Sequence, residues 1–235
     1  MKLRCIWEHN ADDSLIWCEN LPGAYARGES LAAAEKKLLT EAESYAAWAG
    51  LADKAEDFEI TEEKASELNI ADADSDVIFE QERKSLSVEE YLELKRLCLK
   101  SAADFLALYN AVPDKNVGCL PRRKSFYGDV PRTAEEMYVH TRSVNEYYFA
   151  ELGVAAANEG SILECRERGF AALEAMPGFL AEAAQEGSYG EWWSLRKLLR
   201  RFIWHDRIHA KAMYRMAIRC FGKDSVPNVF GFIEY

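Results

Sequence analysis

The chain is short of the residues that mark several common classes of protein. It has only four histidines and six cysteines in 235 residues, and no two cysteines form a CxxC pair. This spacing argues against a zinc ribbon or a dithiol redox site and favours reduced thiols in a cytoplasmic protein. No apolar run approaches the roughly 20 residues of a membrane helix, so we expect no membrane association. The first residues, MKLRCIWEHNADD, turn acidic before an apolar segment develops, so we expect no secretory signal.

Positive charge is also scarce, and its distribution along the chain is uneven. The net charge is −11; residues 1–85 hold 20 acidic and 9 basic residues, whereas residues 86–235 hold 20 of each. The acidic half repels nucleic acid at long range and neither half is strongly basic, so we expect no nucleic-acid partner. The asymmetry predicts two units, with a boundary near residues 71–86.

The first predicted domain, residues 1–80, has the pattern of a small sheet with one helix. Four segments are predicted as strands: LRCIWE, LIWCENL, AYARGES and DFEITEEKA. Between the third and the fourth, Ser30 begins a helical stretch that Gly50 ends. This part of the chain is therefore predicted to be a small α+β module.

The second predicted domain, residues 86–235, has a helical period and is predicted to be an all-α four-helix bundle. Capping boxes begin the first two helices, at Ser87 with Glu90 and at Thr133 with Glu136. The third helical stretch, residues 161–187, is interrupted by Pro177-Gly178, and the fourth covers residues 191–222. The whole chain is thus predicted to be α+β, with a sheet-plus-helix module followed by the bundle.

The segment FIWHDRIHAKAMYRM, residues 202–216, places two histidines four residues apart in the fourth helix. At 100° per residue, His205 and His209 lie about 40° apart on one face. The apolar residues on that face are Leu198, Phe202, Ala212, Met213 and Met216. The basic residues on the opposite side are Arg196, Arg200, Arg207, Lys211 and Arg215. We expect the histidines to face the interior and the basic residues to form a solvated face; a partner surface is the alternative.

A third histidine, His140, shares the inward face of the second helix with Met137 and Val144. Buried imidazoles need hydrogen bonds, and a divalent metal satisfies several at once. Histidines spaced i,i+4 can chelate, and His140 from a facing helix would supply a third ligand. Three ligands leave an open position, which is typical of catalytic sites, and they suit zinc, nickel and iron alike. The alternative is a set of core histidines that are hydrogen-bonded without a metal.

A rival motif is the zincin sequence H-E-x-x-H, which the segment HDRIH matches except for Asp206 in place of glutamate. A zincin needs a third ligand, usually downstream. After His209 the chain offers only Asp224 and Glu234 as carboxylates and no histidine, so we do not favour a metalloprotease. The fourth histidine, His9, lies in a predicted turn, and we assign it no role.

The second domain resembles the DinB superfamily of metal-binding four-helix bundles. The segments that carry the resemblance are TAEEMYVHTRSVNEYYFAEL and LRRFIWHDRIHAKAMYRMA. His140, His205 and His209 match the family's single histidine on the second helix and its HxxxH pair on the last. The resemblance covers residues 86–222 and implies a divalent metal, commonly zinc or nickel, and often a homodimer. It also implies a thiol-dependent S-transferase or isomerase, in which the thiolate of a low-molecular-weight thiol attacks a small-molecule electrophile.

The first domain resembles the HicB-like antitoxin fold over residues 1–65. The segment that carries this resemblance is LIWCENLPGAYARGESLAAAEKKL. In antitoxins the module binds a partner toxin, so the resemblance implies a degenerate module for partner binding or dimerisation. The alternative is a plain structural hairpin, because LPG and ARGES have the composition that is typical of turns.

Two functional hypotheses follow, one an enzyme and the other not. In the enzyme, His140, His205 and His209 hold the metal, and a bound water or thiolate is the nucleophile of a hydrolase or transferase. No general base is assigned; Tyr147 is a candidate substrate contact, and Glu136 and Asp206 are candidate hydrogen-bond partners for the ligating histidines. In the non-catalytic alternative, the HicB-like module recruits a partner and the metal only stabilises the bundle. A bundle without metal is the third outcome.

Overall fold

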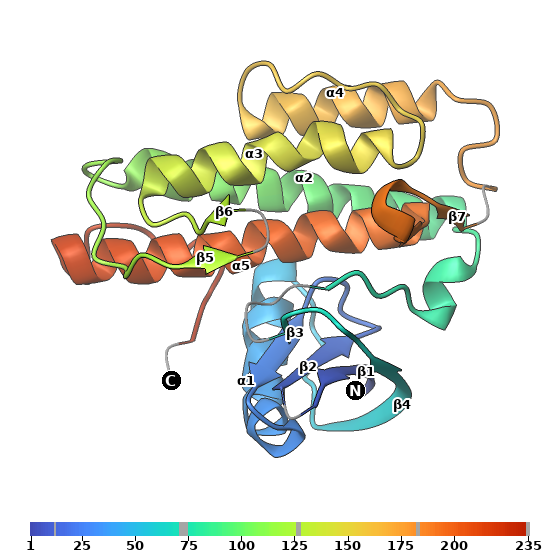
Figure 1. Ribbon diagram of the computed structural model, residues 1–235, viewed down its shortest axis with the longest axis horizontal. Helices are drawn as coiled ribbons and strands as arrows, with labels where there is room; N and C mark the ends of the chain where they lie inside the picture. Colours follow the sequence, from blue (N-terminus) through green and yellow to red (C-terminus); the bar gives the residue numbers. More distant parts are fainter. Residues whose placement is uncertain (12, 71–74, 126–127, 182–183, 234–235) are drawn as a thin grey trace. The chain divides into compact units, whose positions relative to one another are not determined.

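The computed structural model describes residues 1–11, 13–70, 75–125, 128–181 and 184–233. Over these ranges the fold is mixed α+β, as predicted: a four-stranded sheet with a helix comes first and further helices follow (Figure 1). Five α-helices lie in the described part of the chain. The four-helix bundle stays a prediction.

The chain divides into two compact units of contacting residues. The sheet unit comprises Met1–Leu94, Leu180–Trp204 and Gly231–Tyr235, and the helical unit comprises Lys95–Phe179 and His205–Phe230. The division falls inside two long helices, so each unit holds part of both. The domains 1–80 and 86–235 stay a prediction, and residues 71–74 of the predicted boundary lie outside the described residues.

The sheet has the strand order β3-β2-β1-β4. Its strands are β1 (Lys2–Asn10), β2 (Asp13–Cys18), β3 (Tyr25–Gly28) and β4 (Asp57–Ala65). β1 pairs antiparallel with β2, which pairs antiparallel with β3, whereas β1 and β4 are parallel. Parallel neighbours need a crossover connection, and the helix between β3 and β4 provides it. All four predicted strand segments are therefore confirmed.

Helix α1 (Leu31–Ala49) begins and ends where the sequence predicts. The Ser30 side chain accepts a hydrogen bond from the Ala33 N–H, and Gly50 ends the helix in the left-handed conformation at φ 76°. A hydroxyl at the first position and a glycine after the last satisfy backbone groups that the helix leaves unpaired. The buried face of α1 packs beside β2 and β3 and includes Leu38 and Tyr45.

The remaining helices are α2 (Val88–Ala111), α3 (Ala134–Ala150), α4 (Ile162–Glu174) and α5 (Leu195–Phe221). The capping box of Ser87 with Glu90 is present, because each residue's backbone N–H donates to the other's side chain. The box of Thr133 with Glu136 is present as well. Both predicted helix starts are confirmed, which shows how strongly local hydrogen bonding fixes them.

The third helical stretch is shorter than predicted. α4 ends at Glu174, and no helix resumes among residues 175–181 and 184–187, which the structure describes. Pro177 lacks an N–H to donate, and Gly178 adopts φ 74°, so together they end the helix instead of interrupting it. The chain instead forms the short ladder β7 (Gln185–Glu186) with β8 (Trp192–Trp193), and this pairing delays the start of α5.

The predicted solvated basic face of α5 is wrong. Arg200 is 3% exposed and Arg207 is 2% exposed. In the sheet unit, the Arg200 guanidinium pairs with the Glu82 carboxylate and lies 4.1 Å over the Phe79 ring. Lys197 Nζ donates to the Asp76 backbone oxygen at 2.5 Å. Helical projection assumes one side open to solvent, but in the sheet unit Lys197, Arg200 and Arg201 hydrogen-bond to the segment of residues 75–82.

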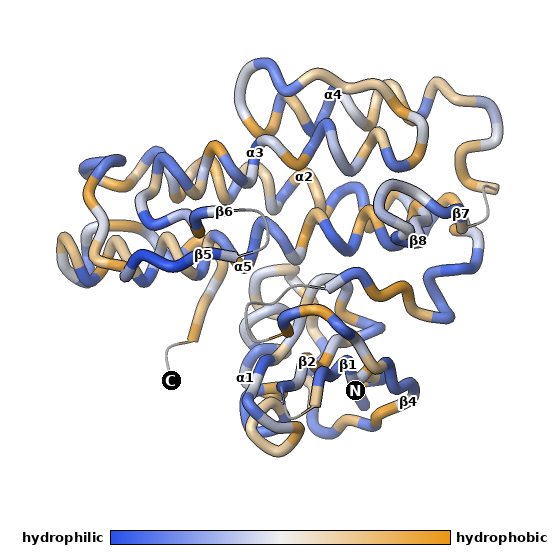
Figure 2. Tube along the Cα trace, in the orientation of Figure 1, coloured by the Kyte–Doolittle hydropathy of each residue, from blue (hydrophilic) through white to orange (hydrophobic). Residues whose placement is uncertain are grey.

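Within the helical unit, α3 packs against both α2 and α4. Tyr138 of α3 stacks on two rings of α2, Tyr109 at 4.1 Å and Phe105 at 6.2 Å between ring centroids. α3 and α4 run side by side (Figure 1). The hairpin of β5 (Lys124–Ser125) and β6 (Gly128–Asp129) lies between α2 and α3 in the chain, and Figure 2 shows that the chain at β5 is strongly hydrophilic.

The described residues also include two short 3₁₀ helices and six cysteines. The 3₁₀ helices are η2 (Glu80–Arg83) and η3 (Ser188–Gly190). All six cysteines are free thiols. None of the helices in the described ranges combines the length and the apolar content that a membrane crossing needs.

Candidate metal centre

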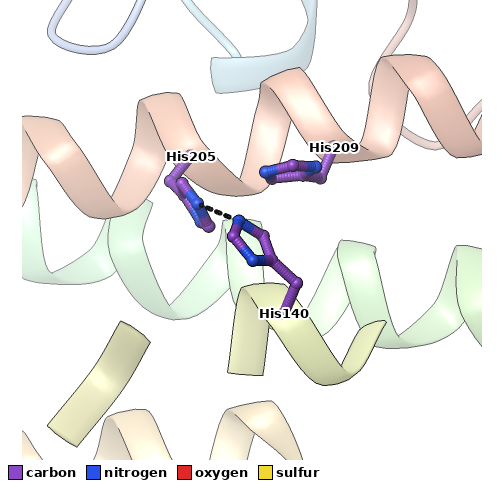
Figure 3. Close-up of side chains that lie close together, drawn as sticks. All are labelled: His140, His205 and His209. Carbon is purple, nitrogen blue, oxygen red and sulfur yellow. Dashed lines mark hydrogen bonds between the residues drawn. The ribbon is translucent and has the colours of Figure 1, made fainter. Parts of the chain in front are cut away.

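Helix α5 presents two of the three predicted ligands. His205 and His209 are one turn apart, and their ring centroids lie 4.5 Å from each other at an interplanar angle of 65°. His205 is 7% exposed and His209 is half-buried. The i,i+4 spacing brings both rings to one side of the helix, as the projection predicts. Figure 3 shows them projecting from α5 toward the same point.

Helix α3 supplies the third predicted ligand. His140 Nε2 lies 3.2 Å from His205 Nε2, and the His140 ring centroid lies 4.7 Å from that of His209. The capping box at Thr133 fixes the start of α3 two turns before His140. The structure therefore brings together all three histidines that the sequence singles out, from two helices 65 residues apart in the chain (Figure 3).

The spacing of the ring nitrogens fits a metal ion. One ligand atom from each of His140, His205 and His209 lies within 4.8 Å of the other two. Zinc binds imidazole nitrogen at about 2.0–2.1 Å in tetrahedral geometry, so two nitrogens on one ion are about 3.3 Å apart. The distance of 3.2 Å between His140 Nε2 and His205 Nε2 is close to this value.

The protonation of the rings also suits a metal. Burial lowers the pKa of His140 below its ordinary value. Burial also lowers the pKa of His209, to about 3, with further contributions from His140 and from the positive charge of Arg123. Both rings are thus neutral at pH 7, and neutral imidazole is the form that coordinates a metal. His140 Nε2 and His205 Nε2 lie 3.2 Å apart, a distance that either a shared proton or a bound cation can bridge.

A tyrosine of α3 lies beside the centre. The ring of Tyr148 lies edge-on to that of His205, with centroids 6.1 Å apart. Tyr147, the candidate substrate contact, is half-buried, and its ring centroid lies 5.6 Å from that of Tyr148. The helical period places both residues near the face of His140 and does not choose between them, so the role of Tyr147 stays a prediction.

The two predicted acidic partners of the histidines have other roles. The Glu136 carboxylate accepts hydrogen bonds from the backbone N–H groups of Arg132 and Thr133, so it caps α3. The Asp206 carboxylate faces Arg166 and Ser101. For the same reason Asp206 does not occupy the place of a zincin glutamate, and Glu234 lies outside the described residues.

The contacts of Asp206 form a buried network that the sequence does not predict. Arg166 and Asp206 are both 0% exposed, and their side chains pair with Nη2 to Oδ1 at 3.1 Å and Nη1 to Oδ2 at 3.2 Å. Ser101 Oγ donates to Asp206 Oδ2 at 2.5 Å. Arg166 Nε donates to Asn145 Oδ1 at 2.6 Å. Burial raises the pKa of Asp206, and the Arg166 guanidinium opposes that shift.

The fourth histidine lies elsewhere. His9 is part of β1, where its ring stacks on Trp7 at 4.2 Å and its Nε2 lies 3.0 Å from Glu63 Oε1. It therefore belongs to the sheet and offers a convenient control for experiments on the other three histidines.

No family model, no curated protein and no solved structure matches this chain. The chemistry of the centre therefore has to be argued from its own residues.

Proposed function

We propose that the chain is a metal-dependent enzyme in which His140, His205 and His209 hold one divalent ion. Zinc or nickel is the first choice and iron the second, because three imidazoles suit all of them. The observation that carries the proposal is the convergence of three ring nitrogens within 4.8 Å of one another. A chain with only four histidines places three of them there.

The arrangement of the helices supports a DinB-like four-helix bundle. The buried network around Arg166 contacts α2 through Ser101 and Cys98, α3 through Asn145 and α5 through Asp206. Arg166 itself lies on α4. Ligand sites in helix bundles are commonly formed by side chains of facing helices, as the three histidines are here.

The proposed reaction is transfer of a low-molecular-weight thiol to an electrophile, with hydrolysis as the second candidate. When bound, the ion lowers the pKa of a coordinated thiol or water, so that the nucleophilic form is present at neutral pH. The chain's own part is to hold three imidazoles on two helices and leave a fourth position open. The ring of Tyr148 lies edge-on beside His205 at this centre.

Metal analysis tests the proposal directly. Protein purified without a histidine tag is loaded with zinc or nickel, dialysed, and analysed for metal content. We expect about one ion per chain, and loss of most of that metal in His209→Ala. The matched control is His9→Ala, which removes a histidine of the sheet and should leave the metal content unchanged. Full metal content in His209→Ala would overturn the three-histidine site.

A screen of model thiols and electrophiles separates enzyme from scaffold. We expect turnover with at least one thiol in the metal-loaded protein, and none in His209→Ala. Hydrolysis of activated esters without a thiol would favour the second reaction. Tight metal binding with no turnover in either assay would favour a non-catalytic protein whose metal stabilises the bundle.

For the sheet unit we propose a HicB-like module that binds a protein partner or a second copy of the chain. The order of three strands, one helix and a fourth strand supports this proposal. The predicted homodimer is tested by the mass of the protein in solution. A monomer at all concentrations would contradict the dimer and leave a different partner as the proposal.

A further inference from the structure

The ion pair between Arg166 and Asp206 lies at the centre of the helical unit. Both side chains are 0% exposed, and two parallel N–H···O contacts of 3.1 and 3.2 Å join them. A buried ion pair of this kind adds little net stability, because removing both charges from water offsets their attraction. What it does provide is geometry, since a guanidinium and a carboxylate fit each other in one plane.

The network is connected to both helices that carry the candidate ligands. On α5, Asp206 is the residue directly after His205. On α3, Asn145 accepts from Arg166 Nε at 2.6 Å and lies five residues beyond His140. The Arg166 side chain therefore fixes α5 through two carboxylate oxygens and α3 through one amide oxygen.

Helix α2 also contacts both members of the ion pair. Ser101 Oγ of α2 donates to Asp206 Oδ2 at 2.5 Å, and Arg166 Nη1 donates to the Cys98 backbone oxygen at 3.2 Å. Rotation of α5 about its axis or a shift along it would break several of these contacts at once. The same motion would carry His205 away from its position 3.2 Å from His140.

We propose that Arg166 and Asp206 are positioning residues for the metal centre: their buried pair sets the rotation and register of α5 against α3, and thereby the distances among the three imidazole nitrogens. This inference rests on the proposed metal-binding function. Metal sites tolerate errors of only about 0.2 Å in ligand distance, so a small change in helix rotation has a large effect on binding.

The test separates position from stability by replacing both charges together. Arg166→Met with Asp206→Leu fills the same space without leaving a lone buried charge, and such replacements are often neutral or stabilising. We expect the metal-free double variant to unfold at close to the wild-type denaturant concentration, yet to bind zinc at least about tenfold more weakly. The visible spectrum of bound Co²⁺, which reports ligand geometry, should change as well. Wild-type zinc affinity together with an unchanged Co²⁺ spectrum would overturn the proposal.

The matched control removes a different ion pair of the helical unit, one that joins α2 to α4. Lys95 of α2 and Glu174 of α4 are paired at 2.5 Å, and neither lies on a helix that carries a histidine ligand. We expect Lys95→Met with Glu174→Leu to leave zinc affinity and the Co²⁺ spectrum unchanged. An equal loss of zinc affinity in this control would show a general effect of charge removal and would overturn the proposal.

A second readout needs no metal and keeps this inference distinct from the proposed function. The imidazole resonances of His140 and His205 in the metal-free protein report the contact between the two rings. We expect them to shift in the Arg166 and Asp206 double variant and to stay in place in the Lys95 and Glu174 control. If the wild type binds no metal, the proposed function fails, while these resonances still decide the positioning role. Unchanged resonances would overturn it. If the apolar pair does not fold, Arg166→Gln with Asp206→Asn keeps the shape and serves instead.

Discussion

Two groups of buried polar side chains meet on α5 of the helical unit, and they differ in kind. Asp206 belongs to a network of opposite charges in which a guanidinium, a hydroxyl and an amide satisfy one another. Its neighbour His205 belongs to a cluster of like groups, three imidazoles of which His140 and His209 are neutral at pH 7. The first group is complete in itself. The second brings three ligand atoms within 4.8 Å of one another, as a metal site requires, and this difference is the reason to assign structure to one and metal binding to the other.

The sheet unit contains a second buried group of oppositely charged side chains. Arg200 and Glu82 form a buried pair there, and the guanidinium also lies over the Trp17 and Phe79 rings. Buried charges with opposite partners therefore occur in both units, whereas the described residues contain one cluster of metal-ligand type, the three histidines. Substitutions that disrupt each group separately should therefore have different effects on stability and on metal binding.

The largest expected effect comes from leaving one buried charge without its partner. Asp206→Ala should lower the free energy of unfolding by about 3–5 kcal/mol, because the Arg166 guanidinium stays buried without a carboxylate. Urea unfolding of the metal-free protein measures it. The double replacement by Met and Leu should cost far less. A small loss in Asp206→Ala would show that the network is not as closed as its contacts indicate.

Metal loading should have the next largest effect on stability, and only in proteins that keep all three histidines of the cluster. At a free zinc concentration of 100 times the dissociation constant, the metal should stabilise the folded protein by about 2.7 kcal/mol. The same addition should not stabilise His209→Ala, and it should stabilise His9→Ala fully. Thermal or urea unfolding with and without zinc gives these values. Equal stabilisation of the wild type, His209→Ala and His9→Ala would show that the metal binds elsewhere.

A smaller effect concerns Glu8, a buried carboxylate of the sheet unit that hydrogen-bonds to Trp17 and Ser75. Burial raises its pKa, with smaller opposing effects from these two hydrogen bonds. The folded state then holds this proton more tightly than the unfolded state. Stability is therefore lost as pH rises from about 4.5 through the folded pKa.

Glu8→Gln keeps the size of the side chain and an oxygen that can accept both hydrogen bonds, but it cannot ionise. We expect the variant to gain stability relative to the wild type as pH rises from 4.5 to 7.5, because only the wild-type side chain has to ionise in the folded state. Urea unfolding at several pH values measures the difference. A difference in unfolding free energy between Glu8→Gln and the wild type that does not change with pH would contradict the raised pKa of Glu8.

The parts of this fold that the sequence predicts are those that neighbouring residues determine. Ser30 and Gly50 bound α1 because a hydroxyl and a left-handed glycine satisfy backbone groups one turn away. The capping boxes start α2 and α3 for the same reason. The histidine centre is predictable too, because a helical period fixes which residues face inward and three rare residues share that property.

The parts that the sequence does not predict depend on distant partners. Asp206 pairs with Arg166, 40 residues away in the chain, and no period or spacing links them. Arg200 and Arg207 are buried because α5 packs on several sides, whereas the projection of one helix assumes a solvent side. The ring contact of Tyr148 with His205 joins two helices that are far apart in the chain. In each case tertiary contact overrides an interpretation that is reasonable for an isolated helix.

The central claim is that the three histidines hold a metal ion. The most direct measurement is an anomalous difference map from crystals of the zinc-loaded protein, with data collected above and below the zinc absorption edge. The account predicts one peak that vanishes below the edge and lies about 2.0–2.1 Å from a ring nitrogen of each of His140, His205 and His209. A zinc-loaded crystal with no peak among these rings, or with its zinc bound elsewhere, would contradict it.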